Sequence, residues 1–203
     1  MLGMRLILSK VFDKFHLLFY KPLWFFKNFL ILKIANISYE QLPSIEGVII
    51  VKNRGYISFG KGVKINSNRY GNPVGNSQKA TFFCSPKGEI IIKENVSMSR
   101  VLLFSQVRIT IEENVMLGGG VQVWDSNFHS INFIDRVLNG DSDIQSKEVI
   151  IKKGVFIGAD SIILKGVTIG ERSVVAAGSI VSKDIPEDEL WGGNPANFIR
   201  KIN

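Results

Sequence analysis

The chain has 203 residues, 45% of them hydrophobic, and a formal net charge of +7, which suits one domain with a sizeable core. Its single cysteine, Cys84, excludes an intrachain disulfide and a cysteine-ligated metal site, and we interpret it as a buried thiol on a strand. The excess positive charge is concentrated in an aromatic-rich helical segment without a nucleic-acid motif, so we expect no nucleic-acid partner.

The first segment, residues 1–44, is basic and aromatic. Residues 1–39 contain six lysines and arginines, one acidic residue and nine aromatic residues. Pro22 is expected near the start of the second of two helices. This composition is typical of an anchor on an anionic membrane surface, or of a helical cap on the following domain, and the two are compatible. Lysines, Pro22 and Asn28 interrupt every apolar run well short of about 18 residues, so we expect no membrane-spanning helix. No small-residue cleavage site follows the short apolar run at residues 6–8, so we expect no secretory signal.

Residues 45–186 follow a period of six. Five branched aliphatic residues stand six apart near the C-terminus, and a companion row precedes each by two positions: Ile157, Ile163, Ile169, Val175 and Val181, with Val155, Ser161, Val167, Ser173 and Ser179. The rows can be traced back to Val51. This period predicts units of one short strand and one turn, three units to a coil, with coils stacked about 4.8 Å apart. We therefore expect an all-β parallel β-helix rather than a sandwich of short strands.

Two polar stretches interrupt the repeat, at residues 66–79 and 124–148. Because a solenoid wall is repetitive, loops that leave it are the expected places for functional side chains. The second loop contains His129, one of two histidines; the other, His16, is interpreted as a surface or packing residue. A neutral imidazole can accept a proton near pH 7, and Asp125, Ser130 or a backbone carbonyl could hold it in one tautomer.

The same loop supplies side chains that suit a sugar acceptor. Trp124 and Phe128 offer apolar faces on which a sugar ring could stack, while Asp125 and Asn127 could bond to its hydroxyl groups. Ordinary loop packing is the alternative for these residues, and it has more weight for Phe128 than for Trp124.

These features together resemble the hexapeptide-repeat acyltransferases, and most closely the maltose, galactoside and capsular-polysaccharide O-acetyltransferases. The resemblance covers roughly residues 88 to 203 and rests on the six-residue units, the Trp-Asp-Ser-Asn-Phe-His-Ser loop, and the runs 166–170, 177–186 and 193–202. It implies a left-handed β-helix, a homotrimer, and acetyl-CoA bound in a groove between neighbouring subunits. The segment 187–203 is then a C-terminal extension that contacts CoA.

The resemblance also implies roles for single residues. The catalytic histidine of the family corresponds to His129, and its acetyl-CoA-binding positions are filled here by Phe156, Gly158, Ala159, Ala177, Lys183 and Arg200. Ala159 departs from the serine that is common at its position, which removes a hydroxyl but keeps the backbone amide. The N-terminal region also lacks the short helical domain usual in the sugar acetyltransferases.

We therefore expect direct O-acetyl transfer from acetyl-CoA to a sugar hydroxyl in polysaccharide or glycan biosynthesis. The expected location is the cytoplasm, where the basic N-terminal segment could hold the enzyme at the inner face of the membrane beside a lipid-linked acceptor. His129 as general base would contribute roughly 10² to 10⁴ in rate. N-acetyl transfer to an amino sugar nucleotide is the alternative. A zinc hydratase of the carbonic-anhydrase type needs three histidine ligands. The chain has two histidines, so no metal is expected. A non-catalytic scaffold would leave the His129 loop without a purpose.

Overall fold

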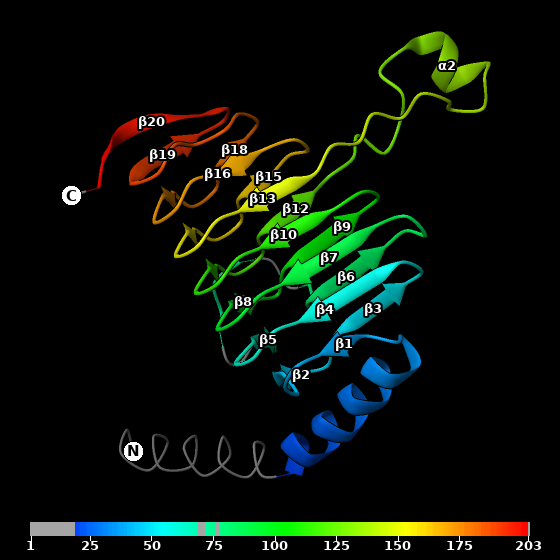
Figure 1. Ribbon diagram of the computed structural model, residues 1–203, viewed down its shortest axis with the longest axis vertical. Helices are drawn as coiled ribbons and strands as arrows, with labels where there is room; N and C mark the ends of the chain where they lie inside the picture. Colours follow the sequence, from blue (N-terminus) through cyan, green and yellow to red (C-terminus); the bar gives the residue numbers. More distant parts are fainter. Residues whose placement is uncertain (1–18, 69–71, 76–77, 203) are drawn as a thin grey trace, which may run out of the picture.

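The computed structural model describes residues 19–68, 72–75 and 78–202, and it is a left-handed parallel β-helix, as the resemblance implied. Short strands wind around a common axis, and every third strand is hydrogen-bonded to the one before it on the same face (Figure 1). Three sheets result, which we name A, B and C. Because each coil pairs with its neighbours through parallel ladders, the backbone polar groups of the wall are satisfied between coils.

The strands of the three faces are short, two to four residues in most coils. Sheet A contains β1 (Ser38–Tyr39), β4 (Tyr56–Phe59), β7 (Glu89–Ile92), β10 (Ile109–Ile111), β13 (Val149–Ile151) and β16 (Thr168–Ile169). Sheet B contains β2 (Ser44–Gly47), β5 (Lys64–Ser67), β8 (Ser97–Ser99), β11 (Met116–Leu117), β14 (Phe156–Ile157), β17 (Val174–Val175), β19 (Glu189–Gly193) and β20 (Ala196–Lys201). Sheet C contains β3 (Ile50–Asn53), β6 (Thr81–Cys84), β9 (Leu102–Ser105), β12 (Gln122–Trp124), β15 (Ile162–Ile163) and β18 (Ile180–Val181).

The two rows of the six-residue period form the core. All five residues of the aliphatic row are buried, and so are all five of the smaller companion row. The serines of the companion row are satisfied inside the coil, since Ser161 Oγ and Ser179 Oγ both donate to the Ala176 carbonyl, at 3.0 and 2.6 Å. Cys84 is buried on β6, as expected.

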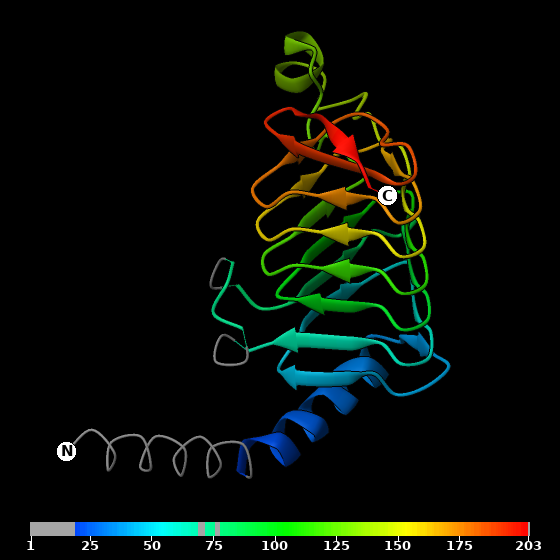
Figure 2. The ribbon, with the colours of Figure 1, turned by 90° about the vertical axis from the view of Figure 1, so that its left-hand side faces the viewer.

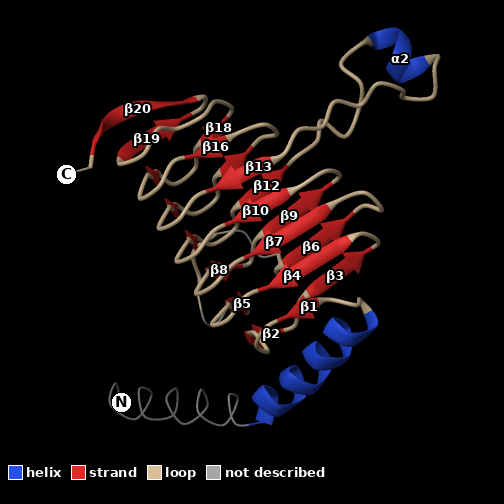
Figure 3. Cartoon of the chain, viewed as in Figure 1, coloured by secondary structure: helices blue, strands red, loops and turns tan. Residues whose placement is uncertain are grey.

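A helix over residues 19–34 covers the first coil (Figures 1 and 3). Leu32 is 1% exposed and belongs to the hydrophobic core. The Asn28 amide donates to Gly47 O at 2.8 Å and its oxygen accepts from Ile49 N at 3.2 Å, so the helix satisfies backbone groups that the open first coil would leave unpaired. This is the packing expected of a cap. Residues 1–18, where the first expected helix and His16 fall, lie outside the described residues.

The stack of strands begins earlier than the expected boundary at residue 45. Ser38 and Tyr39 of β1 already pair in parallel with Ser58 and Phe59 of β4, so the first coil starts directly after the helix. The six-residue signal is weak here because these edge positions contribute few fully buried side chains.

An antiparallel hairpin closes the other end of the solenoid. β19 continues sheet B in parallel with β17, and β20 then turns back along β19 (Figure 2). The guanidinium of Arg172 contacts both carboxylate oxygens of Asp188, at 2.7 and 2.6 Å, and the hydrogen bond raises the pKa of Arg172 above its usual range.

Over the described part of the chain, we find no helix with the length and apolarity needed to span a membrane.

Candidate functional site

The long loop leaves the solenoid after β12 and returns at β13, at the corner between sheets C and A, and it projects well beyond the wall (Figure 1). Its two ends run side by side, with an antiparallel bridge between Ser126 and Ser146 and a hydrogen bond from Asn127 N to Gln145 O at 3.0 Å. A paired neck of this kind fixes the direction in which the tip of the loop points.

Asp125 anchors this neck and does not orient His129, which corrects our expectation. It is fully buried, and its carboxylate accepts hydrogen bonds from Ser105 Oγ, Gln106 N and Val107 N, at 2.7, 2.7 and 2.8 Å. These donors come from the end of β9 and the turn that follows it, on the coil below. These three hydrogen bonds hold the carboxylate against the solenoid wall, because a buried acceptor stays beside its donors. It is therefore not available to orient His129.

The partner of His129 is Asp141, from the returning half of the loop. His129 Nδ1 lies 2.5 Å from Asp141 Oδ2, and Ser130 N donates to Asp141 Oδ1 at 2.8 Å. The hydrogen bonds from Ser130 N and then from His129 lower the pKa of Asp141. The imidazole is 71% exposed, so a substrate can reach its other nitrogen. Sequence reasoning missed Asp141, since the four aspartates of this loop are equally plausible by composition.

The tip of the loop is a short helix, α2 (Phe133–Val137), that holds the backbone directly after His129. The Asn132 side chain caps it by accepting from Ile134 N at 2.8 Å. Arg136 Nη1 donates to the carbonyls of Ser130 and Ile131, at 2.7 and 3.1 Å. The segment next to His129 is thus fixed by hydrogen bonds although it is exposed.

Trp124 and Phe128 pack on an aromatic ladder along the outside of sheet C. The ring centroids of Trp124 and Phe128 lie 5.6 Å apart, those of Phe104 and Phe128 4.5 Å, and those of Phe83 and Phe104 4.9 Å. Loop packing is therefore what the structure shows for Phe128. Trp124 differs, because its buried Nε1 has no hydrogen-bond partner among the described residues. Asn127 is half-buried in the neck.

The corner between sheets B and C is built from very small residues on successive coils. A Cβ atom on Gly118 would lie 2.6 Å from Ala159 N, and one on Gly158 would lie 2.4 Å from Ala177 N, so only glycine fits at these two positions. Within the described residues, the amide N–H groups of Ala159 and Ala177 donate no hydrogen bond. The corner thus presents free backbone donors on a surface without bulky side chains.

A pocket of about 580 Å³ opens on sheet B beside this corner. Its lining includes Phe156 and Ala159 from the predicted acetyl-CoA positions, together with Gly118, Gly119 and the described part of the first loop at Asn72 and Val74. The first loop leaves after β5 and returns at β6. The guanidinium of buried Arg100 donates to the Val74 carbonyl, a contact that sequence reasoning also missed, and this holds the loop against the pocket.

The structure brings some predicted residues together and separates others. Phe156, Gly158, Ala159 and Ala177 share the corner between sheets B and C. Lys183 follows β18 and lies at the corner between sheets C and A, the same corner from which the His129 loop leaves, and Arg200 lies on β20 at the end of sheet B. Within one chain, the histidine and the small-residue corner are therefore on different edges of the triangular coil.

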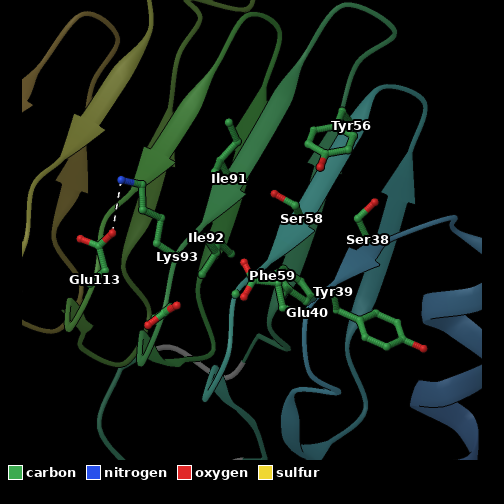
Figure 4. A pocket seen from close by; sticks show the side chains of 12 residues that line it. Ser38, Tyr39, Glu40, Tyr56, Ser58, Phe59, Ile91, Ile92, Lys93 and Glu113 are labelled. Atoms are coloured by element: carbon green, nitrogen blue, oxygen red, sulfur yellow. Dashed lines mark ion pairs between the residues drawn. The ribbon is translucent and has the colours of Figure 1, made fainter.

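A second pocket, on sheet A, contains none of the predicted site residues. It has a volume of about 410 Å³ and lies between β1, β4 and β7, where Lys93 Nζ is 3.3 Å from Glu113 Oε1 (Figure 4). Its lining is mainly hydroxyl, carboxylate and aliphatic groups.

We find no group of three or more histidine, cysteine, aspartate or glutamate side chains arranged to hold a metal in the part of the chain that the structure describes.

Comparison with known proteins connects these features to a family. Residues 148–183 match the family model described as the hexapeptide repeat of succinyl-transferase. The chain is 34% identical over 122 residues to the "Putative acetyltransferase YJL218W" of Saccharomyces cerevisiae, covering 60% of each chain. It is 24% identical over 180 residues to the "Putative lipopolysaccharide biosynthesis O-acetyl transferase WbbJ" of Escherichia coli K12, covering 84% of each.

Solved structures agree with the sequence matches. A maltose O-acetyltransferase from Clostridium difficile 630 matches with a TM-score of 0.55 and 26% identity, over 85% of this chain and 73% of that one. The chain spans 44 to 60% of the length of three of the curated relatives that it matches. These matches confirm the resemblance to the hexapeptide-repeat acyltransferases.

Proposed function

We propose that this protein transfers an acetyl group from acetyl-CoA to a sugar hydroxyl, with His129 as the general base. The observation that carries the proposal is the exposed His129 held by Asp141, on a solenoid whose small-residue corner offers the free amides of Ala159 and Ala177. The similarity to the acetyltransferases named above supports acetyl-CoA as the donor. The similarity to WbbJ and to the maltose enzyme supports a carbohydrate acceptor in polysaccharide or glycan biosynthesis.

The proposed assembly is a homotrimer, because one chain does not complete the site. His129 and Lys183 lie along the edge between sheets C and A, whereas Ala159 and Ala177 lie along the edge between sheets B and C. Three solenoids packed side by side would set one edge of each chain against the other edge of its neighbour. The acetyl-CoA groove would then run between subunits, with Phe156, Gly158, Ala159 and Ala177 from one chain and Lys183 from the next, and with Arg200 near its phosphate end.

The protonation state of His129 follows from its partner. Asp141, with its lowered pKa, is ionised at neutral pH and can only accept a hydrogen bond, so Nδ1 of His129 carries the proton. The lone pair of Nε2 is then free to take the proton of an acceptor hydroxyl. Asp141 also stabilises the imidazolium that this step creates.

The transfer is direct. The deprotonated acceptor oxygen attacks the thioester carbonyl carbon, and the carbonyl oxygen gains the negative charge, for which the amide of Ala159 is the proposed donor. The tetrahedral intermediate collapses as the carbon–sulfur bond breaks. The departing CoA thiolate takes the proton from Nε2, which returns the imidazole to its starting state. No covalent acyl-enzyme is formed, so Cys84 takes no part.

Trp124 and Asn127 are the proposed acceptor contacts of the loop. The unpartnered Nε1 of Trp124 can donate to a sugar oxygen, since a buried N–H group without a partner is costly unless a ligand or a neighbouring subunit satisfies it. A lipid-linked glycan is the acceptor class that fits an enzyme held at the inner membrane face.

The test is release of CoA thiol from acetyl-CoA against a panel of sugars, amino sugar nucleotides and lipid-linked glycans. We expect release with a hydroxyl acceptor and a product whose acetyl group is removed by mild alkali, because esters hydrolyse where amides do not. An alkali-stable product formed only with an amino sugar would establish N-acetyl transfer instead. Absence of acceptor-dependent release across the panel would contradict the acetyl-transfer proposal.

A further inference from the structure

The capping helix has a second face, opposite the one that packs on the solenoid. With 100° per residue, Leu23, Phe26, Leu30 and Ile34 fall within an arc of about 80°. Their exposed fractions are 46, 60, 41 and 84%. The buried Asn28 and Leu32 lie on the other side of the same helix. We call these four exposed residues the outer stripe.

Lysines border the outer stripe on both sides. Lys27 and Lys33 each fall about 20° beyond an edge of the arc, one on each side, and both are exposed. The Nζ atom of Lys33 lies 5.8 Å from the ring centroid of Phe29, which keeps the charge next to the helix. Residues 19–39 contain three lysines and no acidic residue, so the whole face is positive.

The outer stripe is directed away from the body of the protein. Asn28 and Leu32 fix the opposite face on the first coil, and in both views the helix lies at the end of the stack, with no other described segment on its outer side (Figures 1 and 2). A contiguous apolar surface in this position needs an occupant.

We infer that the outer stripe docks on an anionic lipid surface, with the four apolar side chains in the headgroup boundary and Lys27 and Lys33 on lipid phosphates. An apolar stripe flanked by cations is the arrangement that binds such a surface in the plane of the interface. Pairing of two stripes from two copies of the chain is disfavoured, because it would bring lysines together without an acidic partner on either face. The inference does not rest on the proposed acetyl transfer.

The structure also explains how one helix serves two purposes. Only the narrow face around Asn28 and Leu32 packs on the solenoid. The other faces of the helix can therefore carry side chains that suit contact with lipid. Packing on the first coil keeps this segment helical before it contacts a membrane. Binding therefore avoids the entropic cost of ordering that a disordered anchor would bear.

The experiment is flotation of the full-length protein with vesicles of phosphatidylcholine alone and of phosphatidylcholine mixed with phosphatidylglycerol. We expect binding to the mixed vesicles only, weakened by salt. The double variant Lys27→Glu and Lys33→Glu, and separately the double variant Phe26→Ser and Leu30→Ser, should each lower the partition coefficient about tenfold or more. Matched controls are Lys61→Glu with Lys87→Glu for charge, and Val107→Ser for an exposed apolar residue.

Each other outcome overturns the inference. Wild-type protein that stays with the aqueous fraction, variants that bind like wild type, or equal binding to neutral vesicles would all contradict it. Self-association that is lost in the Phe26→Ser and Leu30→Ser variant, without vesicle binding, would identify the outer stripe as a contact between copies. Circular dichroism of each variant establishes that the solenoid is intact, and the binding assay contains no acetyl-CoA, so its result is independent of catalysis.

Discussion

His129 Nδ1 lies 2.5 Å from Asp141 Oδ2, twelve positions further along the chain. This contact joins the two halves of a loop that leaves the solenoid, and it fixes which imidazole nitrogen is available to a substrate. Asp141 in turn is held by the backbone amide of Ser130, so the pair is part of the fold of the loop tip rather than a chance meeting of two side chains.

Replacing Asp141 by asparagine should therefore lower kcat about tenfold or more while changing KM for acetyl-CoA little, because the imidazole loses its fixed tautomer and its anionic partner. Steady-state kinetics of purified Asp141→Asn measure this. Asp143→Asn is the matched control, since Asp143 lies two residues on and, among the described residues, its carboxylate accepts a hydrogen bond only from Gln145 Nε2. Equal kcat values for wild type and Asp141→Asn would exclude the pair from catalysis.

The same pair predicts how the wild-type enzyme responds to acid. The lowered pKa of Asp141 means that the carboxylate stays ionised below the pH at which a free aspartate is protonated, and its interaction with His129 is lost only as pH falls through the lowered value. In Asp141→Asn the partner does not titrate. We expect the ratio of wild-type to Asp141→Asn kcat to stay constant in the neutral range and to fall only in acid, as pH drops through the lowered pKa of Asp141. A ratio that stays constant in acid as well would contradict a role for the ionised carboxylate.

Asp125 should behave as a structural residue. Asp125→Ala removes an acceptor of three hydrogen bonds and leaves buried donors on the turn after β9, at a cost of about 3 kcal/mol in the free energy of unfolding. Denaturant unfolding measures this. Ser105→Ala removes one of the three donors and should cost less. A stable Asp125→Ala protein with only its catalytic rate impaired would argue that Asp125 acts on His129 after all.

The corner glycines predict a contrast between two substitutions. Gly158→Ala places a methyl group 2.4 Å from Ala177 N and should destabilise the protein by about 1 to 3 kcal/mol and weaken CoA binding. Gly178→Ala has open space and only a strained φ of +70°, so about 1 kcal/mol is expected. Thermal unfolding and CoA titration compare them. Normal stability and CoA affinity in Gly158→Ala would contradict the close-packed corner.

The fold followed from the sequence to a large extent because its signal is periodic. Ile157 and Val175 occupy equivalent places in successive coils. The period of six therefore predicts both the position of each strand and which of its side chains points into the core. The break in the repeat after Val123 likewise located the His129 loop, because an interruption is visible against a regular background.

Details of that loop could not be read in the same way. The choice of Asp141 over Asp125 depends on where the neck between Ser126 and Ser146 returns the chain and on the commitment of Asp125 to the turn after β9. Neither is a local property. The face of the capping helix that remains exposed is set in the same manner, by the docking of Asn28 on Gly47 and Ile49.

The most direct test of the central claim is the rate of acetyl transfer by His129→Ala on an acceptor that wild type uses. We expect an intact fold, unchanged acetyl-CoA affinity, and a kcat at least about a hundredfold below wild type, since the general base is gone. Transfer by His129→Ala at a rate close to wild type would contradict the assignment of His129 and, with it, the mechanism built on this loop.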